Sequence, residues 1–261
     1  MKATLRLLAS AALLLSQVSR AQAQEAEQPV KPTLEKLATD GASAGAMSPL
    51  LMSASLGDQR ALVMGAGGYD SSRRGAIMDS AVDARVWGPI ALRLGVTYSE
   101  ATKRMRPSAG ARAQLLQQRV QGVDASITSV FKTEGFDELE GEIETTFAIG
   151  RRFEHFYLLG NIAYGQDPEG NERDGELRTG LFYQRGHGVV GLEVRARAAI
   201  GPQRVPNAAV EPKFDAVGGP IAMYSVSSFA FFAEAGPAVV QLPGSDLRWG
   251  VASLGGVGSV F

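Results

Sequence analysis

Apolar and polar residues alternate through many stretches of this 261-residue chain. Between Val190 and Ile200 every second side chain is apolar, whereas Glu193, Arg195 and Arg197 stand at positions between them. A helix would scatter these residues around its circumference, but a strand sorts them onto two faces. The alternation therefore predicts β-strands that have one apolar face and one ionised face.

Twelve such stretches follow one another from residue 59 to residue 261. Their lengths match the roughly 9–11 residues that a tilted strand needs to cross a bilayer. The predicted strands are residues 59–69, 79–87, 90–99, 109–118, 122–133, 139–150, 154–165, 175–185, 188–200, 214–225, 228–241 and 247–261.

The connections between these stretches alternate in length, and long loops at one end with short turns at the other are typical of transmembrane barrels. Tight connections are predicted at Gly88–Pro89, Arg119–Gln121, Arg151–Phe153, Gly186–His187 and Val226–Ser227, and longer ones at Asp70–Met78, Glu100–Ser108, Glu134–Glu138, Gln166–Asp174, Gly201–Lys213 and Leu242–Asp246. The sequence thus predicts an all-β fold, a transmembrane antiparallel up-and-down β-barrel of about twelve strands. A soluble periplasmic β-protein is the alternative, but it gives no reason for loops segregated in this way.

The first residues have the order of a secretory signal peptide. Lys2 and Arg6 precede an apolar run, Leu7–Leu15, and the small-residue triplet Ala21–Ala23 follows. We therefore expect residues 1–23 to be a signal peptide, residues 24–58 a periplasmic leader or plug, and residues 59–261 the barrel. These features together predict location in the outer membrane of a bacterial cell.

Composition excludes several classes of function. The chain has no Cys, which excludes disulfides, thiolate metal sites and thiol catalysis. It has 26 Lys and Arg against 27 Asp and Glu, and this balance argues against a nucleic-acid partner. No cofactor is predicted.

One face of the predicted wall is heavily charged. If that face pointed to lipid, each Arg or Lys near the midplane would cost about 2–4 kcal/mol, so we expect it to face the lumen. Phe182 falls on the same face and does not fit the pattern. The lumen-lining residues predicted in this way are Arg85, Arg93, Arg112, Lys132, Glu140, Glu142, Glu144, Arg178, Glu193, Arg195, Arg197 and Glu234.

The last predicted strand, LRWGVASLGGVGSVF, ends in an aromatic residue, Phe261. It resembles the C-terminal strand of bacterial outer-membrane β-barrel proteins, although Ser253, Gly255 and Ser259 depart from the apolar alternation of that strand. The blocks KTEGF, EGEIE and YGQDPEGNERDGE also resemble those of uncharacterised bacterial barrel proteins. The resemblance implies outer-membrane lipid and the barrel-assembly machinery as partners, with Phe261 as the assembly signal.

Two hypotheses for the lumen follow from its size. Eight strands enclose a packed interior and sixteen to eighteen an open channel, so twelve lie between these cases. The first hypothesis is a narrow porin-like channel for small polar or zwitterionic solutes, in which acids on one side and arginines on the other orient the solute. The second is an occluded, non-conducting structural or binding barrel that displays its extracellular loops.

An enzyme, such as an outer-membrane lipase, is the third class. His155 and His187 show no recognisable nucleophile–base arrangement, so no catalytic residues are predicted. The loop at residues 166–175 has oxygen-bearing side chains at alternate positions, as calcium loops do, but it lacks the EF-hand spacing. A solvated loop is therefore favoured over a metal site at the weak candidates Asp167, Glu169, Asn171 and Asp174.

Overall fold

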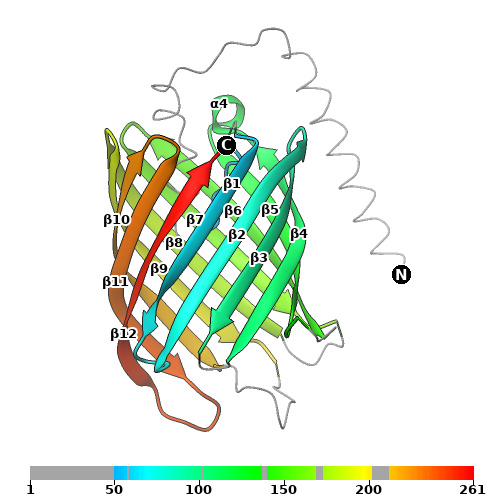
Figure 1. Cartoon of the computed structure of the whole chain (residues 1–261), viewed down its shortest axis with the longest axis vertical. Helices are drawn as coiled ribbons and strands as arrows, with labels where there is room; N and C mark the ends of the chain where they lie inside the picture. Colours follow the sequence, from blue (N-terminus) through cyan, green and yellow to red (C-terminus); the bar gives the residue numbers. More distant parts are fainter. Residues whose placement is uncertain (1–49, 58, 101–102, 137–139, 169–172, 202–211) are drawn as a thin grey trace. The chain divides into compact units, whose positions relative to one another are not determined.

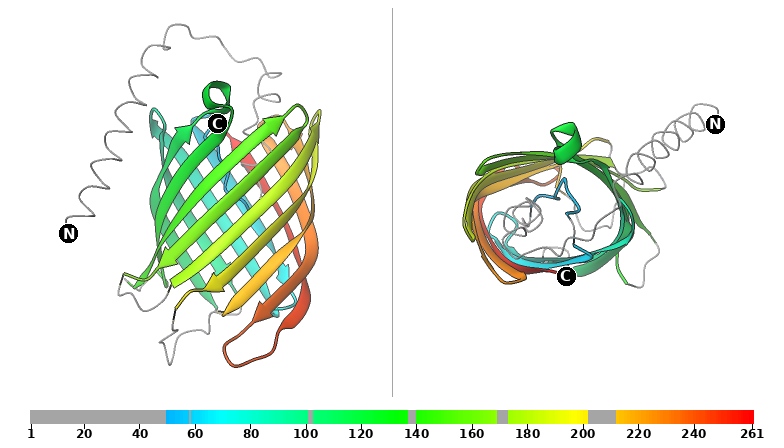
Figure 2. Two further views of the ribbon diagram at one scale, coloured as in Figure 1. Left: turned by 180° about the vertical axis from the view of Figure 1, so that it is seen from behind. Right: turned by 90° about the horizontal axis from the view of Figure 1, so that it is seen from above.

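The strands close into a barrel in which each strand pairs antiparallel with its neighbour in sequence, and β1 pairs with β12 (Figures 1 and 2). This computed structural model describes residues 50–261 except residue 58 and residues 101–102, 137–139, 169–172 and 202–211. The fold is the predicted all-β, up-and-down transmembrane barrel. The expected signal peptide, residues 1–23, and residues 24–49 of the expected leader lie outside the described residues.

Twelve strands and one short helix make up the described chain. The helix α4, Gln118–Gln121, lies between β4 and β5. The strands are β1 (Ala61–Asp70), β2 (Gly75–Trp87), β3 (Ile90–Ser99), β4 (Arg104–Leu116), β5 (Asp124–Thr133), β6 (Gly141–Phe153), β7 (Phe156–Gln166), β8 (Arg173–Arg185), β9 (Gly188–Ala199), β10 (Phe214–Val226), β11 (Phe229–Gln241) and β12 (Arg248–Val260).

Several predicted connections were wrong in position. β2 and β4 begin earlier than expected, so residues 71–74 alone join β1 to β2, and residues 100–103 join β3 to β4. Pro107 falls within the loop predicted at Glu100–Ser108 but pairs with Val96 inside β4. Arg151–Phe153 belongs to β6, and the tight turn is Glu154–His155, where Glu154 has a φ of 48°. Both ends of the barrel therefore carry short turns, and the segregation of loops is less strict than predicted.

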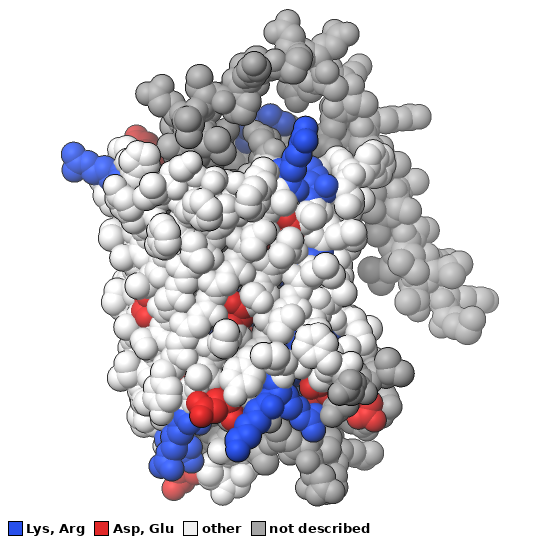
Figure 3. All heavy atoms as spheres, in the orientation of Figure 1, with Lys and Arg blue, Asp and Glu red and all other residues white. Residues whose placement is uncertain are grey.

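The two faces of the wall differ as the alternation predicted. On β9, Val190, Leu192 and Val194 are 56%, 61% and 50% exposed, whereas Glu193 is 1% exposed. On the face seen in Figure 3, few charged side chains lie between the two ends of the barrel, and most gather at the ends. An apolar belt between polar ends is the surface that a bilayer requires. Within the described residues, no helix has the length and apolarity to cross a membrane.

Exposed aromatic side chains stand near both ends of the apolar belt. Trp87 and Phe261, both on the short-turn side that bears the C-terminus, are 70% and 66% exposed. Trp249 and Tyr69, at the opposite ends of β12 and β1, are 71% and 49% exposed. Amphipathic rings at both interfaces are typical of membrane barrels.

The chain enters the barrel before it becomes part of the wall. Residues Leu50–Gly57, named here the lumen strap, lie inside the ring of strands (Figure 2). Leu51, Ser53 and Ala54 are 4%, 3% and 0% exposed. The described end of the expected leader therefore fills part of the lumen.

Candidate functional site

A buried amide on β7 pairs with the backbone of the lumen strap. Asn161 is 1% exposed and lies on the inner face. The backbone N–H of Met52 donates to its Oδ1 at 2.7 Å, and its Nδ2 donates to the carbonyl of Met52 at 2.8 Å. Asn161 thus satisfies both backbone groups of one strap residue, as a neighbouring strand would.

Side chains of β4 and β5 hold the middle of the strap. Arg112 Nη2 donates to the carbonyls of Ser53 and, at 3.1 Å, Ser55. The hydroxyl of Ser126 donates to the Ser53 carbonyl at 3.2 Å, and the N–H of Leu56 donates to Gln114 Oε1 at 2.7 Å. Buried backbone groups need such partners, and here the inner wall supplies them.

Arginine side chains reach the strap from one sector of the wall, formed by β2, β3 and β4. Arg85 on β2 donates to the carbonyl of Gly57. Arg85 and Arg112 flank the same residue, Ala91 of β3, in the strand register. Asp83 lies 2.9 Å from Arg93 and 3.3 Å from Arg112, so a single carboxylate serves both guanidinium groups.

Apolar contacts anchor the start of the strap on the opposite wall. Leu51 and Ala54 belong to a buried cluster with Phe182 of β8 and Leu159 of β7, both 0% exposed. A Cβ atom on Gly180 would lie 2.5 Å from Leu51 Cδ1, so the missing side chain makes room for the strap. This packing explains why Phe182, which did not fit a wet lumen, faces inward.

The strap leaves little free space beside it. One void of about 10 Å³ lies among Ser55, Leu56, Arg85 and Arg112. Another, of about 20 Å³, lies among Met52, Ser53, Arg93 and Arg112. A cavity needs about 10–15 Å³ to hold one water, so neither void offers a path for a solute.

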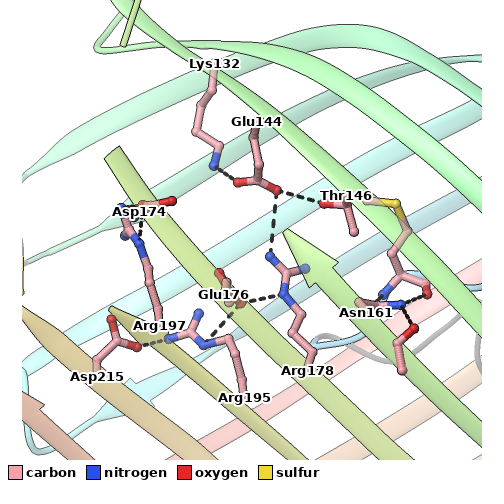
Figure 4. Close-up of polar contacts among 12 residues, drawn as sticks. Lys132, Glu144, Thr146, Asn161, Asp174, Glu176, Arg178, Arg195, Arg197 and Asp215 are labelled. Atoms are coloured by element: carbon pink, nitrogen blue, oxygen red, sulfur yellow. Dashed lines mark hydrogen bonds and ion pairs between the residues drawn. The ribbon is translucent and has the colours of Figure 1, made fainter. Parts of the chain in front are cut away.

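Ion pairs form a connected chain along the other half of the lumen wall, named here the ionic belt (Figure 4). Lys132 lies 2.8 Å from Glu144, Arg178 pairs with Glu144 at 3.7 Å and with Glu176, and Arg195 joins Glu176 to Asp215. Arg73, from the turn between β1 and β2, lies 2.7 Å from Asp215. The belt comprises Asp70, Arg73, Arg104, Arg106, Lys132, Glu134, Glu142, Glu144, Glu176, Arg178, Arg195 and Asp215.

The ionic belt has six basic and six acidic members among the described residues. Arg197 and Asp174 add a further pair of opposite sign. The acids of β6 are thus not set against distant arginines, because Lys132 and Arg178 contact them directly. Equal charges of both signs at short range produce little long-range field, so the belt favours neither cations nor anions.

Most of the predicted lumen residues face inward, with one exception. Glu140 precedes β6 and is exposed. The first inward-facing glutamate of β6 is Glu142, whose carboxylate lies 3.3 Å from the Lys132 ammonium. Glu193 and Glu234 are 1% and 5% exposed on the inner wall. Neither carboxylate oxygen of Glu234 has a hydrogen-bond partner in the described chain.

Residues that bind the strap through neutral groups are absent from the predicted lumen residues. Asn161, Gln114 and Ser126 occupy inward positions, but the predicted set contains only ionised residues. The sequence pattern that could identify such a residue is a single polar side chain at an inward position, with small or apolar residues on both sides of it, as in Leu159-Gly160-Asn161-Ile162-Ala163. Arg106 and Asp215 were also missed because they lie near predicted strand ends.

The weak metal candidates are not brought together in the described chain. Glu169 and Asn171 lie outside the described residues, and the Asp174 carboxylate pairs with Arg197. No group of three or more His, Asp or Glu side chains suited to a metal occurs within the residues that the structure describes. His155 and His187 lie at the short-turn end. The ring centroid of His155 lies 5.9 Å from that of Tyr183, and the ring centroid of His187 lies 6.3 Å from that of Tyr224.

Comparisons with known proteins concern the fold. No protein-family model and no curated protein sequence matches the chain. The NanC porin structure aligns with a TM-score of 0.55 and 10% identity over 76% of this chain and 99% of that chain. The KdgM porin aligns with a TM-score of 0.52 and 10% identity over 77% of this chain and 99% of that chain. The chain therefore shares the barrel fold of two bacterial outer-membrane porins.

Proposed function

We propose that this protein is a porin-like outer-membrane channel for small polar or zwitterionic solutes, closed in the described conformation by the lumen strap. The observation that carries the proposal is the strap itself, which crosses the lumen on hydrogen bonds from Asn161, Gln114 and Arg112. The strap belongs to the segment that precedes the first strand, so it can leave without breaking the wall. The balanced ionic belt suits solutes that carry both charges or none.

The expected leader now has a defined role in this proposal. Residues 50–57 act as the plug, and residues 59–261 supply the wall. Export by a signal peptide at residues 1–23 and assembly through Phe261 remain part of the proposal. Outer-membrane lipid faces the apolar belt, and the solute uses the inner face.

Conductance in planar bilayers tests the proposal. The full-length chain should conduct rarely, and a variant that lacks residues 50–57 should open a steady, small conductance. Heat-modifiable migration in gels confirms that each variant contains a folded barrel. A variant with Ser129→Ala, on the outer face, is the control because the Ser129 hydroxyl hydrogen-bonds with Thr145 of the neighbouring strand and not with the strap.

An occluded barrel with a structural or binding role is the second candidate. The voids of about 10 and 20 Å³ beside the strap favour it, because neither is large enough to pass a solute. If the folded deletion variant conducts no more than the full-length chain, the channel proposal is wrong and the occluded barrel is supported.

A further inference from the structure

The strap presents its carbonyl oxygens to arginines at alternate positions. The carbonyls of Ser53 and Ser55 accept hydrogen bonds from Arg112, and that of Gly57 accepts one from Arg85. Three strap carbonyl oxygens thus accept hydrogen bonds from two guanidinium groups inside the lumen.

These guanidinium groups are only partly satisfied by the strap. The Nε atoms of Arg112 and Arg85 are buried and have no hydrogen-bond partner in the described chain. A guanidinium presents its donors as a fork that fits two oxygens of one carboxylate or phosphate. The strap carbonyls leave the Nε donor of each arginine without a partner, so each arginine retains a donor that an oxyanion would use.

The surroundings of the two arginines also favour an anion. Arg85, Arg93 and Arg112 share this sector of the wall, and Asp83 is the carboxylate that contacts Arg93 and Arg112. Removal of the strap would leave three positive charges against two carboxylates there, those of Asp83 and Asp79. The void of about 10 Å³ lies between Arg85 and Arg112, beside Ala91, which has a small side chain.

We propose that Arg85 and Arg112 form an oxyanion-binding site, that the strap carbonyls occupy it as an internal substitute, and that a solute bearing a carboxylate or phosphate displaces the strap. This inference rests on the proposed function, because it names the chemical group by which a solute opens the channel. It is compatible with zwitterionic solutes, which carry such a group. The anion gains charge-assisted, bidentate hydrogen bonds that the neutral carbonyls cannot make.

Cysteine labelling tests the displacement without measuring conductance. Because the chain has no Cys, Ser53→Cys introduces a single thiol at a position that is 3% exposed, with almost no change in size. The labelling rate with a maleimide is measured in detergent with sodium acetate or sodium phosphate, and with sodium chloride at equal ionic strength. Either oxyanion should raise the rate several-fold over chloride, and comparison of the two salts distinguishes carboxylate from phosphate.

Lysine variants test the two arginines, since lysine keeps the charge and removes the fork. Arg85→Lys with Arg112→Lys should abolish the increase caused by the oxyanion. Arg248→Lys is the matched control, because Arg248 also bonds a backbone carbonyl, that of Ser72, but lies away from the strap. Equal rates in oxyanion and chloride, or an increase that survives the double lysine variant, would overturn the inference.

The outcome is separable from that of the channel proposal. If oxyanions speed labelling but the strap deletion does not raise conductance, the site stands and the channel fails. If the deletion conducts but oxyanions leave the labelling rate unchanged, the channel stands and the site fails.

Discussion

Single polar side chains on the inner wall decide where the strap lies. Asn161 offers a donor and an acceptor at the spacing of a peptide group, so it recognises backbone rather than any particular strap side chain. A buried polar group that loses its partner costs about 1–3 kcal/mol. The position of the strap therefore depends on few residues, and each can be tested by itself.

Asn161→Ala should loosen the strap, because it leaves the N–H and C=O of Met52 without their partner. A cost of about 1–3 kcal/mol corresponds to a rise of roughly 5- to 150-fold in the labelling rate at Ser53→Cys. Ser129→Ala, which removes a hydroxyl from the outer face, should leave that rate unchanged. An unaltered rate in the Asn161 variant would show that apolar packing alone holds the strap.

Lys132 is the second residue whose removal has a defined consequence. Its ammonium lies 2.8 Å from Glu144 and 3.3 Å from Glu142, so Lys132→Met leaves two carboxylates facing each other. Loss of one partner of a buried ion pair destabilises by about 3–5 kcal/mol. Denaturant unfolding in detergent should show this loss, and adding Glu144→Gln should restore part of it.

Lys103→Met provides the control for Lys132, because Lys103 is exposed in the turn between β3 and β4. Its unfolding midpoint should match that of the unmodified chain. Equal destabilisation by Lys103→Met and Lys132→Met would mean that net charge, rather than the contact with Glu144, sets the stability.

At the scale of elements, the alternation within each strand was enough to predict the twelve strands and their two faces. The stretch Val190–Ile200 illustrates this, because Val190, Leu192 and Val194 are exposed on the outside whereas Glu193 is buried on the inside. The partner of each charge could not be predicted, because Lys132 meets Glu144 only through the register between β5 and β6. The starts of β2 and β4 were missed because Gly75 and Pro107 resemble turn residues.

The strap contacts could not be derived from a local pattern either. Met52 and Asn161 are 109 positions apart, and nothing in the residues near Met52 indicates a partner. The expectation of a leader or plug came from composition alone. Which residues enter the lumen, and how they bind, depends on the closed ring of strands.

The seam between β1 and β12 gives a prediction for the last residue. Phe261 donates its N–H to Ala61, and its carbonyl accepts from Arg60 at 2.7 Å, while its ring is 66% exposed. Phe261→Ala keeps the backbone bonds and removes only the ring. If the ring is the assembly signal, this variant should reduce the yield of folded barrel in cells but leave the thermal stability of the purified barrel unchanged.

Deletion of Phe261 is the companion variant, since it removes the backbone bonds as well. It should lower both the yield and the thermal stability. Normal yields of the Phe261→Ala barrel would argue against recognition of the ring.

At the scale of the whole molecule, the proposed plug would separate the lumen into two compartments. Thr97 faces inward on β3 in the half that contains the ionic belt, and Ser225 faces inward on β10 near the short turns. In intact expressing cells, an impermeant thiol reagent should label Thr97→Cys but not Ser225→Cys. Deletion of residues 50–57 should make both reactive; early labelling of Ser225→Cys in the full-length chain would mean that the strap does not seal the barrel.

The attachment of the strap also constrains how the barrel can form. Only a few residues separate Gly57 from β1, and β1 meets the last strand to be synthesised, β12. The strap's binding partners on β4, β5 and β7 all exist before that final pairing. The curling sheet can thus wrap around the strap and seal afterwards, whereas a finished cylinder would require it to be threaded in from one end. If the barrel forms in this order, chains with a weakened strap should pair β1 with β12 slowly or not at all.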